Sequence, residues 1–174
     1  NQGLDILGGV IYGARVSLQV SLLAVTVGIL VGGIAGTVAG YFRGIPDMIF
    51  GFITDSLLAF PPLVLLLAVV AAINPTVWTI SLALALLGIP TMGRLARANT
   101  LTFAQREFVL AARSLGASRR RVIFRELIPN VVRPLLSYAF LIVAVLIVAE
   151  ASLSFLNVGI SRPTPTWGNM IAAG

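Results

Sequence analysis

The side chains that could do chemistry in this 174-residue sequence are few, and their types exclude most classes of enzyme. Histidine and cysteine are absent, which excludes thiolate or imidazole metal sites, cysteine nucleophiles and histidine-based triads. Lysine is also absent, which excludes the phosphate-binding loop that depends on a lysine. The carboxylates form no close pair along the chain and are Asp5, Asp47, Asp55, Glu107, Glu126 and Glu150. We therefore expect no catalytic site, no metal site and no cofactor bound by this chain itself.

The composition is typical of a membrane protein. Apolar residues make up 58% of the chain and charged residues 10%, with a mean hydropathy of +1.01, whereas about a quarter of a soluble domain is charged. The formal net charge is +6. A basic charge can indicate nucleic-acid binding, but a soluble binder would carry its charges over a water-facing surface. We expect instead that the arginines mark the cytoplasmic side of a lipid bilayer and that nucleic acid is no partner.

Apolar segments long enough to cross a bilayer as helices are predicted at about 16–41, 48–73, 77–93 and 134–156. The first carries small residues every four positions, at Ala24, Gly28, Gly32, Gly36 and Gly40, which predicts a face for close helix packing. Pro134 is expected to open the last segment. The tail at 157–174 is rich in glycine and proline and is expected to be a loop without a helix.

Two features of these segments are candidates to border a solute path. In the second segment, Phe60, Pro61 and Pro62 predict a break, and carbonyls freed at membrane depth must bind protein groups or line a wet cavity. Asp55 and Glu150 are the second feature, because carboxylates within membrane segments are costly and are often functional. For Glu150, which is expected near the outer end of its span, a structural pairing with a residue such as Arg15 is an equally good interpretation.

Residues 94–133 carry nine arginines and two glutamates, a net charge of +7. At ~2.5 kcal/mol for each arginine at the centre of a bilayer, burying this segment in lipid would cost more than about 20 kcal/mol. The positive-inside rule therefore predicts a cytoplasmic segment. Four spans then place both ends of the chain on the opposite side from this segment.

A short helix with an apolar face is predicted inside the cytoplasmic segment. The face is formed by residues at helical spacing, namely Phe108, Ala111, Ala112 and Leu115. Gly116 is expected to end this helix, and Ser118 to cap a second one that runs to Ile128 and ends at Pro129. The small residues leave room for a partner protein to come close. For the arginine run at 119–121, anchoring to anionic lipid headgroups is the alternative interpretation.

These residues resemble a motif in the permease subunits of binding-protein-dependent ABC importers, E-A-A-x-x-x-G followed further along by a proline. The matching segments are "LAARSLG" at 110–116 and "ELIPN" at 126–130. Flanking segments look like the second, C-type, permease subunit of the dipeptide/oligopeptide/nickel branch: "IYGARVSL" (11–18), "DSLLAFPPL" (55–63), "EASLSFL" (150–156) and "PTPTWGNM" (163–170). Leu110 stands where the family has glutamate, which puts the acidic contact of that residue in question.

The resemblance implies an all-α membrane protein, a polytopic transmembrane helix bundle of the type I, MetI-like, permease class. Residues 1–174 would form one permease domain with a cytoplasmic coupling loop at 94–133, lacking one flanking span at each end. The helix that docks on the ATPase would use Phe108, Leu110, Ala111, Ala112, Leu115, Gly116 and Ala117.

The resemblance also implies a set of partners in a prokaryotic inner or plasma membrane. These are a homologous second permease subunit, two cytoplasmic subunits that bind ATP and Mg, and an extracytoplasmic solute-binding protein. The expected function is import of dipeptides or oligopeptides. The alternatives are import of nickel or another small solute, an ion-coupled channel or secondary transporter with Asp55 or Glu150 as the relay, and a scaffold that transports nothing.

Overall fold

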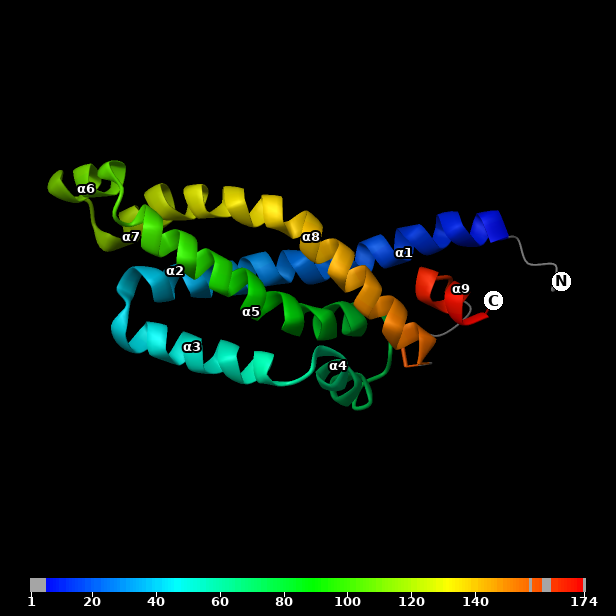
Figure 1. The fold of residues 1–174 in the computed structure, drawn as a ribbon. Helices are drawn as coiled ribbons and strands as arrows, with labels where there is room; N and C mark the ends of the chain where they lie inside the picture. The colour runs from blue at the N-terminus through cyan, green and yellow to red at the C-terminus, as the bar shows by residue number, and fades with distance from the viewer. Residues whose placement is uncertain (1–5, 157, 161–163, 174) are drawn as a thin grey trace.

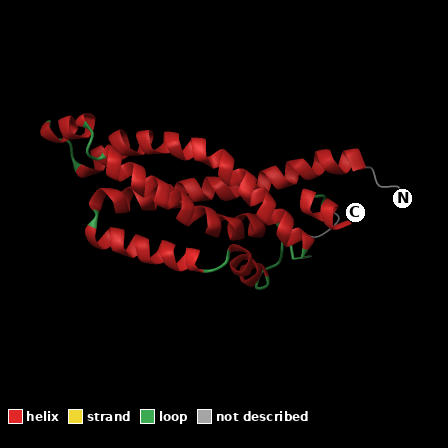
Figure 2. Cartoon of the chain, viewed as in Figure 1, coloured by secondary structure: helices red, strands yellow, loops and turns green. Residues whose placement is uncertain are grey.

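The computed structural model describes residues 6–156, 158–160 and 164–173, and every regular element in these ranges is a helix (Figure 2). In chain order the elements are α1 (Ile6–Val27), the π-helical turn η1 (Gly28–Gly32), α2 (Gly33–Phe42), α3 (Gly44–Ala59), α4 (Pro62–Val70), α5 (Val77–Phe103), α6 (Glu107–Ser114), α7 (Arg119–Arg121), the π-helical turn η2 (Val122–Leu127), α8 (Ile128–Phe155) and α9 (Trp167–Ala173). The predicted all-α fold is confirmed.

Long apolar helices run side by side along an elongated bundle (Figure 1). Among the described residues, three continuous helices could cross a membrane, at Ile6–Phe42, Val77–Phe103 and Arg119–Phe155, and α3 with α4 could form a fourth, bent span. Their shared core contains buried side chains from α1, α4, α5 and α8, such as Val20, Leu66, Leu84 and Leu146. Figure 1 places α6 at one end of the bundle and α9 at the other, so the two ends carry different elements.

Several predicted helix boundaries are wrong. The helix that begins at Arg119 continues through Pro129 and Pro134 to Phe155, so the first proline does not end it and the second does not open it. The turn η2 ends at Leu127, two residues before Pro129. Local π-helical adjustment is one way in which membrane helices satisfy the carbonyls that a proline leaves without a donor. Likewise, α5 extends beyond the predicted end at 93, through Pro90, to Phe103.

The tail was expected to hold no helix, and α9 contradicts this expectation. The Thr166 hydroxyl accepts a hydrogen bond from the backbone N–H of Asn169, at 3.1 Å, which caps the first turn. The Asn169 side-chain amide donates to the carbonyl of Ile160 at 2.7 Å, which ties the helix to the preceding loop. Thr166 is a residue type favoured at helix N-caps, and this local signal outweighs the high glycine and proline content of the tail.

The glycine face of the first long helix packs against α5, as predicted. A Cβ placed on Gly32 would lie 2.2 Å from the carbonyl oxygen of Ile89, and one on Gly36 would lie 2.0 Å from that of Gly93. Such distances are far inside van der Waals contact, so the two backbones touch where side chains normally stand. The turn η1 falls within the same glycine face.

The predicted break between α3 and α4 is also confirmed. Phe60 and Pro61 have extended ψ angles of 138° and 128°, and the axes of the two helices differ by 88°. Pro62 occupies the first turn of α4, where a missing N–H costs no helical hydrogen bond. The bend turns α4 so that Leu66 and Val70 enter the main core.

Replacing both Pro61 and Pro62 with alanine is expected to straighten this segment, because alanine restores the missing donors and removes the ring clash with helix. Spin labels on the exposed positions 52 in α3 and 64 in α4 would measure the change. In a continuous helix they would stand about 18 Å apart along the axis, so the distance between the labels reports whether the bend persists. Pro46→Ala in the first turn of α3 is the control and should change nothing. An unchanged distance in the double variant would mean that core packing of α4, not proline, holds the bend.

Candidate functional site

The short helix α6 stands on a defined corner at one end of the bundle. Gly116 follows it with φ +79°, a left-handed conformation that favours glycine. Its N–H donates to the carbonyl of Arg113 at 2.9 Å, and the N–H of Ala117 donates to that of Ala112 at 3.0 Å, which together form a Schellman motif. Ser118 then caps the next helix by accepting from the N–H of Arg121 at 3.4 Å. The predicted glycine corner and serine cap are confirmed.

The inner face of α6 is fixed to the long helices. Val109 is completely buried in a second small core, which it forms with Val122, Ile123 and Leu127 of the helix after the corner. The guanidinium of Arg113 lies over the ring of Tyr41 from α2, 5.1 Å from its centroid, in a cation–π contact. The helix α6 is therefore in direct contact with both long helices.

The outer face of α6 exposes large apolar side chains to solvent. Leu115 is 89% exposed, Leu110 50% and Phe108 38%, and Ala111 is exposed beside them. Exposed residues of this kind, grouped on a helix that is itself anchored, are typical of an interaction surface. We call these four residues the outer face of α6 from here on.

Two of the predicted docking residues are less exposed than the outer face. Ala112 is half-buried, and Ala117 packs against the second core. Val109 is the residue that anchors α6 to the long helices. Sequence reasoning did not single out Val109, although Val109 and Ala112, three positions apart, define an alternative apolar face. Gly116, in the corner, has open space around it.

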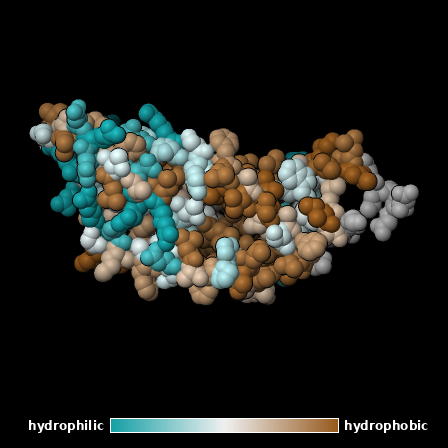
Figure 3. Space-filling model, in the orientation of Figure 1, coloured by the Kyte–Doolittle hydropathy of each residue, from teal (hydrophilic) through white to brown (hydrophobic). Residues whose placement is uncertain are grey.

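Basic side chains surround this end of the bundle. The arginines at 119–121 are exposed on α7. Figure 3 shows hydrophilic side chains gathered at the end that carries α6 and α7, whereas hydrophobic side chains cover most of the visible face toward the other end. This separation of charge from apolar surface is the pattern that the positive-inside rule describes for one side of a membrane.

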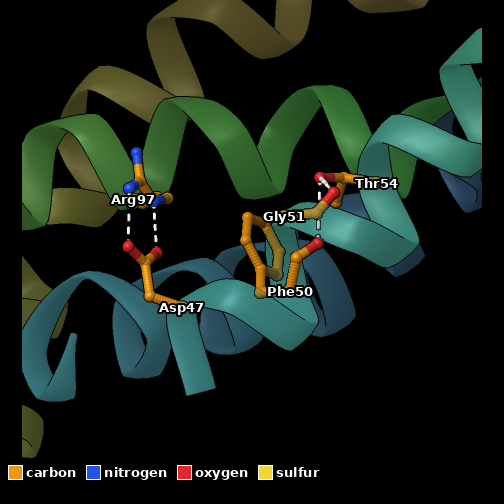
Figure 4. Close-up of polar contacts among 5 residues, drawn as sticks. All are labelled: Asp47, Phe50, Gly51, Thr54 and Arg97. Carbon is orange, nitrogen blue, oxygen red and sulfur yellow. Dashed lines mark hydrogen bonds and ion pairs between the residues drawn. The ribbon is translucent and has the colours of Figure 1, made fainter. Parts of the chain in front are cut away.

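Two ion pairs, which sequence reasoning missed, fasten α3 to α5 near the same end. Arg97 contacts both carboxylate oxygens of Asp47, with Nη2 at 2.7 Å from Oδ2 and Nε on Oδ1 (Figure 4). Arg94 Nη2 lies 2.5 Å from Asp55 Oδ1, with both side chains largely exposed. The ring of Phe50 packs between these pairs against Gly93, where a Cβ would come within 2.8 Å of the ring.

The candidate path residues are thus distributed over separate places. Asp55 forms an ion pair with Arg94, while Phe60, Pro61 and Pro62 are exposed at the bend. Glu150 is completely buried, and its partners are hydroxyl groups rather than Arg15, which is exposed. The structure does not bring Asp55 and Glu150 together as partners of one another. In the described ranges, no group of three or more histidine, cysteine or acidic residues could hold a metal ion.

Comparison with known proteins gives one matching family and relatives that are permease proteins of transport systems. The family described as "Binding-protein-dependent transport system inner membrane component" matches residues 21–174. The dipeptide transport system permease protein DppC of Alkalihalophilus pseudofirmus is 37% identical over 170 residues, which cover 98% of this chain and 56% of that protein. The glutathione transport system permease proteins GsiD of Shigella dysenteriae and Escherichia coli are each 38% identical over 169 residues, 97% of this chain and 56% of those proteins. The chain therefore spans about half the length of the curated relatives it matches.

Proposed function

Because this chain belongs to the family of inner membrane components of binding-protein-dependent transport systems, within its dipeptide/oligopeptide branch, we propose that it forms part of the path by which an ATP-driven importer carries short peptides across the cell membrane. The named solutes of the relatives support the substrate class, since dipeptides and glutathione are both small peptides. The helices of the bundle would cross the membrane several times, with α6 and α7 on the cytoplasmic side.

The observation that carries this proposal is the construction of α6. Its outer face presents Phe108, Leu110, Ala111 and Leu115 to solvent at the basic end of the bundle, while Val109 fixes it to the helix that continues into α8. An ATPase subunit that binds the outer face could move the long helices through this anchor. This coupling requires an exposed apolar surface on a helix that is rigidly packed against the bundle, because a loosely attached loop would not transmit the movement of the ATPase to the long helices.

The energy would come from partner subunits. The chain has no lysine for a phosphate-binding loop, so ATP and Mg would be bound by two cytoplasmic ATPase subunits docked under this chain and a homologous second permease subunit. An extracytoplasmic solute-binding protein would deliver peptide to the opposite end. Asp55 is paired with Arg94 of α5, which supports a structural role for this carboxylate over an ion relay.

The test is uptake by the full-length permease, assembled in proteoliposomes with its second permease subunit, ATPases and binding protein. We expect labelled dipeptide to accumulate only with ATP on the side that carries α6, and the ATPases to co-purify with the permease. Three other results would contradict the proposal. Accumulation of Ni²⁺ but not peptide would make the solute assignment wrong, uptake driven by an ion gradient without ATPases would indicate a secondary transporter, and absence of both uptake and bound ATPase would indicate a scaffold.

A further inference from the structure

A carboxylate with two hydroxyl partners lies buried near the end of α8. Glu150 is 0% exposed; its Oε1 accepts a hydrogen bond from Ser154 Oγ at 2.8 Å, and its Oε2 accepts one from Ser17 Oγ of α1 at 3.3 Å. Removing a carboxylate from water is expensive, and a chain retains one at such a site only where hydrogen bonds hold it. The end of α8 is therefore tied to α1 by a polar contact inside an apolar bundle.

Ser17 extends this contact to α9. The backbone N–H of Trp167, the first residue of α9, donates to Ser17 Oγ at 3.3 Å. A serine hydroxyl has one proton to donate and two lone pairs. Because the proton of Ser17 is directed to Glu150, a lone pair is left to accept from Trp167. Glu150 thus acts on α9 through the orientation of the Ser17 hydroxyl, which makes Glu150 a positioning residue.

The remaining contacts of α9 are close but involve little apolar side chain. A Cβ on Gly168 would lie 2.6 Å from the Cα of Ala151, and one on Gly13 would lie 3.3 Å from the backbone nitrogen of Trp167, so backbones meet directly. The indole N–H of Trp167 donates to the carbonyl of Val10 at 3.1 Å. Beyond these contacts Ile171 is 66% exposed. Elements with few buried apolar contacts are the ones that open at low free energy.

We propose that the chain of hydrogen bonds from Glu150 through Ser17 to Trp167 is a latch, which holds α9 on α1 and α8 and closes the end of the bundle opposite α6 (Figure 1). Release of this latch detaches α9 and opens that end to solute. The inference rests on the proposed importer function, under which this end faces the solute-binding protein. It assigns the buried carboxylate to gating rather than to ion transfer or to a salt bridge.

The experiment measures how easily α9 detaches in the complete importer. A single cysteine replaces Met170, which is partly buried and lies over Gly9, in a full-length background without other cysteines. The rate of its reaction with a membrane-impermeant maleimide reports the opening of α9. Ser17→Ala removes both hydrogen bonds and should raise the rate about tenfold without nucleotide, the effect expected when two buried hydrogen bonds are lost. Glu150→Gln keeps the shape and one acceptor oxygen, and should raise the rate by less.

Ser21→Ala is the matched control. Ser21 is also buried, lies one turn further along α1, and donates to a backbone carbonyl of its own helix, that of Ser17, at 2.8 Å. Its removal should leave the labelling rate unchanged. In the parent importer, trapping the ATPases in their ATP-bound state should raise the rate. Equal rates for Ser17→Ala and the parent, or no response of the parent to ATP, would overturn the latch. Absence of dipeptide uptake by the parent would overturn the proposed function instead, because labelling without nucleotide does not depend on transport.

Discussion

Tryptophan in place of Ala111 will uncouple ATP hydrolysis from peptide uptake while the helices still insert into the membrane. Ala111 is an exposed small residue within the outer face of α6, between the exposed side chains of Leu110 and Leu115. An indole at this position would hold a docked ATPase away from the helix backbone. Overpacking of a close contact typically costs about 1–3 kcal/mol, so we expect uptake to fall by about 5- to 150-fold.

The measurement compares peptide uptake, ATPase co-purification and ATP hydrolysis stimulated by the loaded binding protein. Ala72→Trp is the matched control, because it makes the same change at an exposed residue just after α4, away from α6. Ala112 is a poorer position for this test than Ala111. Ala112 is half-buried, so a tryptophan there would disturb the packing of α6 on the long helices as well as the docked surface. Normal coupling of ATP hydrolysis to uptake in the Ala111 variant would contradict the proposal that the ATPase docks on the outer face of α6.

Alanine in place of Gly36 is expected to be the most destabilising single-methyl change in the bundle. Its Cβ would lie 2.0 Å from the carbonyl oxygen of Gly93 and 2.8 Å from the carbonyl carbon, and both atoms belong to backbone that cannot rotate away. The helices α2 and α5 would have to separate, and their packing would be lost over several turns. We expect a loss of ~3 kcal/mol or more in the free energy of unfolding, at the upper end of overpacking costs.

Gly51→Ala provides the control for this prediction. Gly51 lies within α3, where an added Cβ would meet nothing within 4 Å, and alanine in an open helix interior gains about 0.5–1 kcal/mol over glycine. Thermal unfolding in detergent, followed by circular dichroism, should therefore show a lower midpoint for Gly36→Ala and an equal or higher midpoint for Gly51→Ala. If the two variants unfold alike, α2 and α5 tolerate separation and the glycine face is not needed for stability.

Some features could be predicted from the sequence because their physical cause is local. An uncharged stretch such as 16–41 must be a membrane helix, since only a helix satisfies its own backbone in lipid. Glycines at a spacing of four must share a helix face. The pair Pro61–Pro62 removes adjacent donors whatever surrounds it, and Gly116 favours a left-handed corner for the same intrinsic reason. In each case neighbouring residues alone set the outcome.

Other features depended on segments far apart in the sequence and were decided only by the tertiary structure. The pairing of Asp47 with Arg97 joins helices fifty positions apart, and the contact of Ser17 with Glu150 spans 133 positions. Val109 became the buried anchor of α6 because the small core of η2 lies on that side of the helix. Pro129 failed to end its helix because the preceding π-helical turn and the surrounding bundle outweighed its local preference. The sequence alone determined which long apolar segments form helices and where α3 and α4 meet at a bend. Only packing between helices decided where the other helices end and which polar side chains find partners, because each such contact requires two separately specified surfaces to meet.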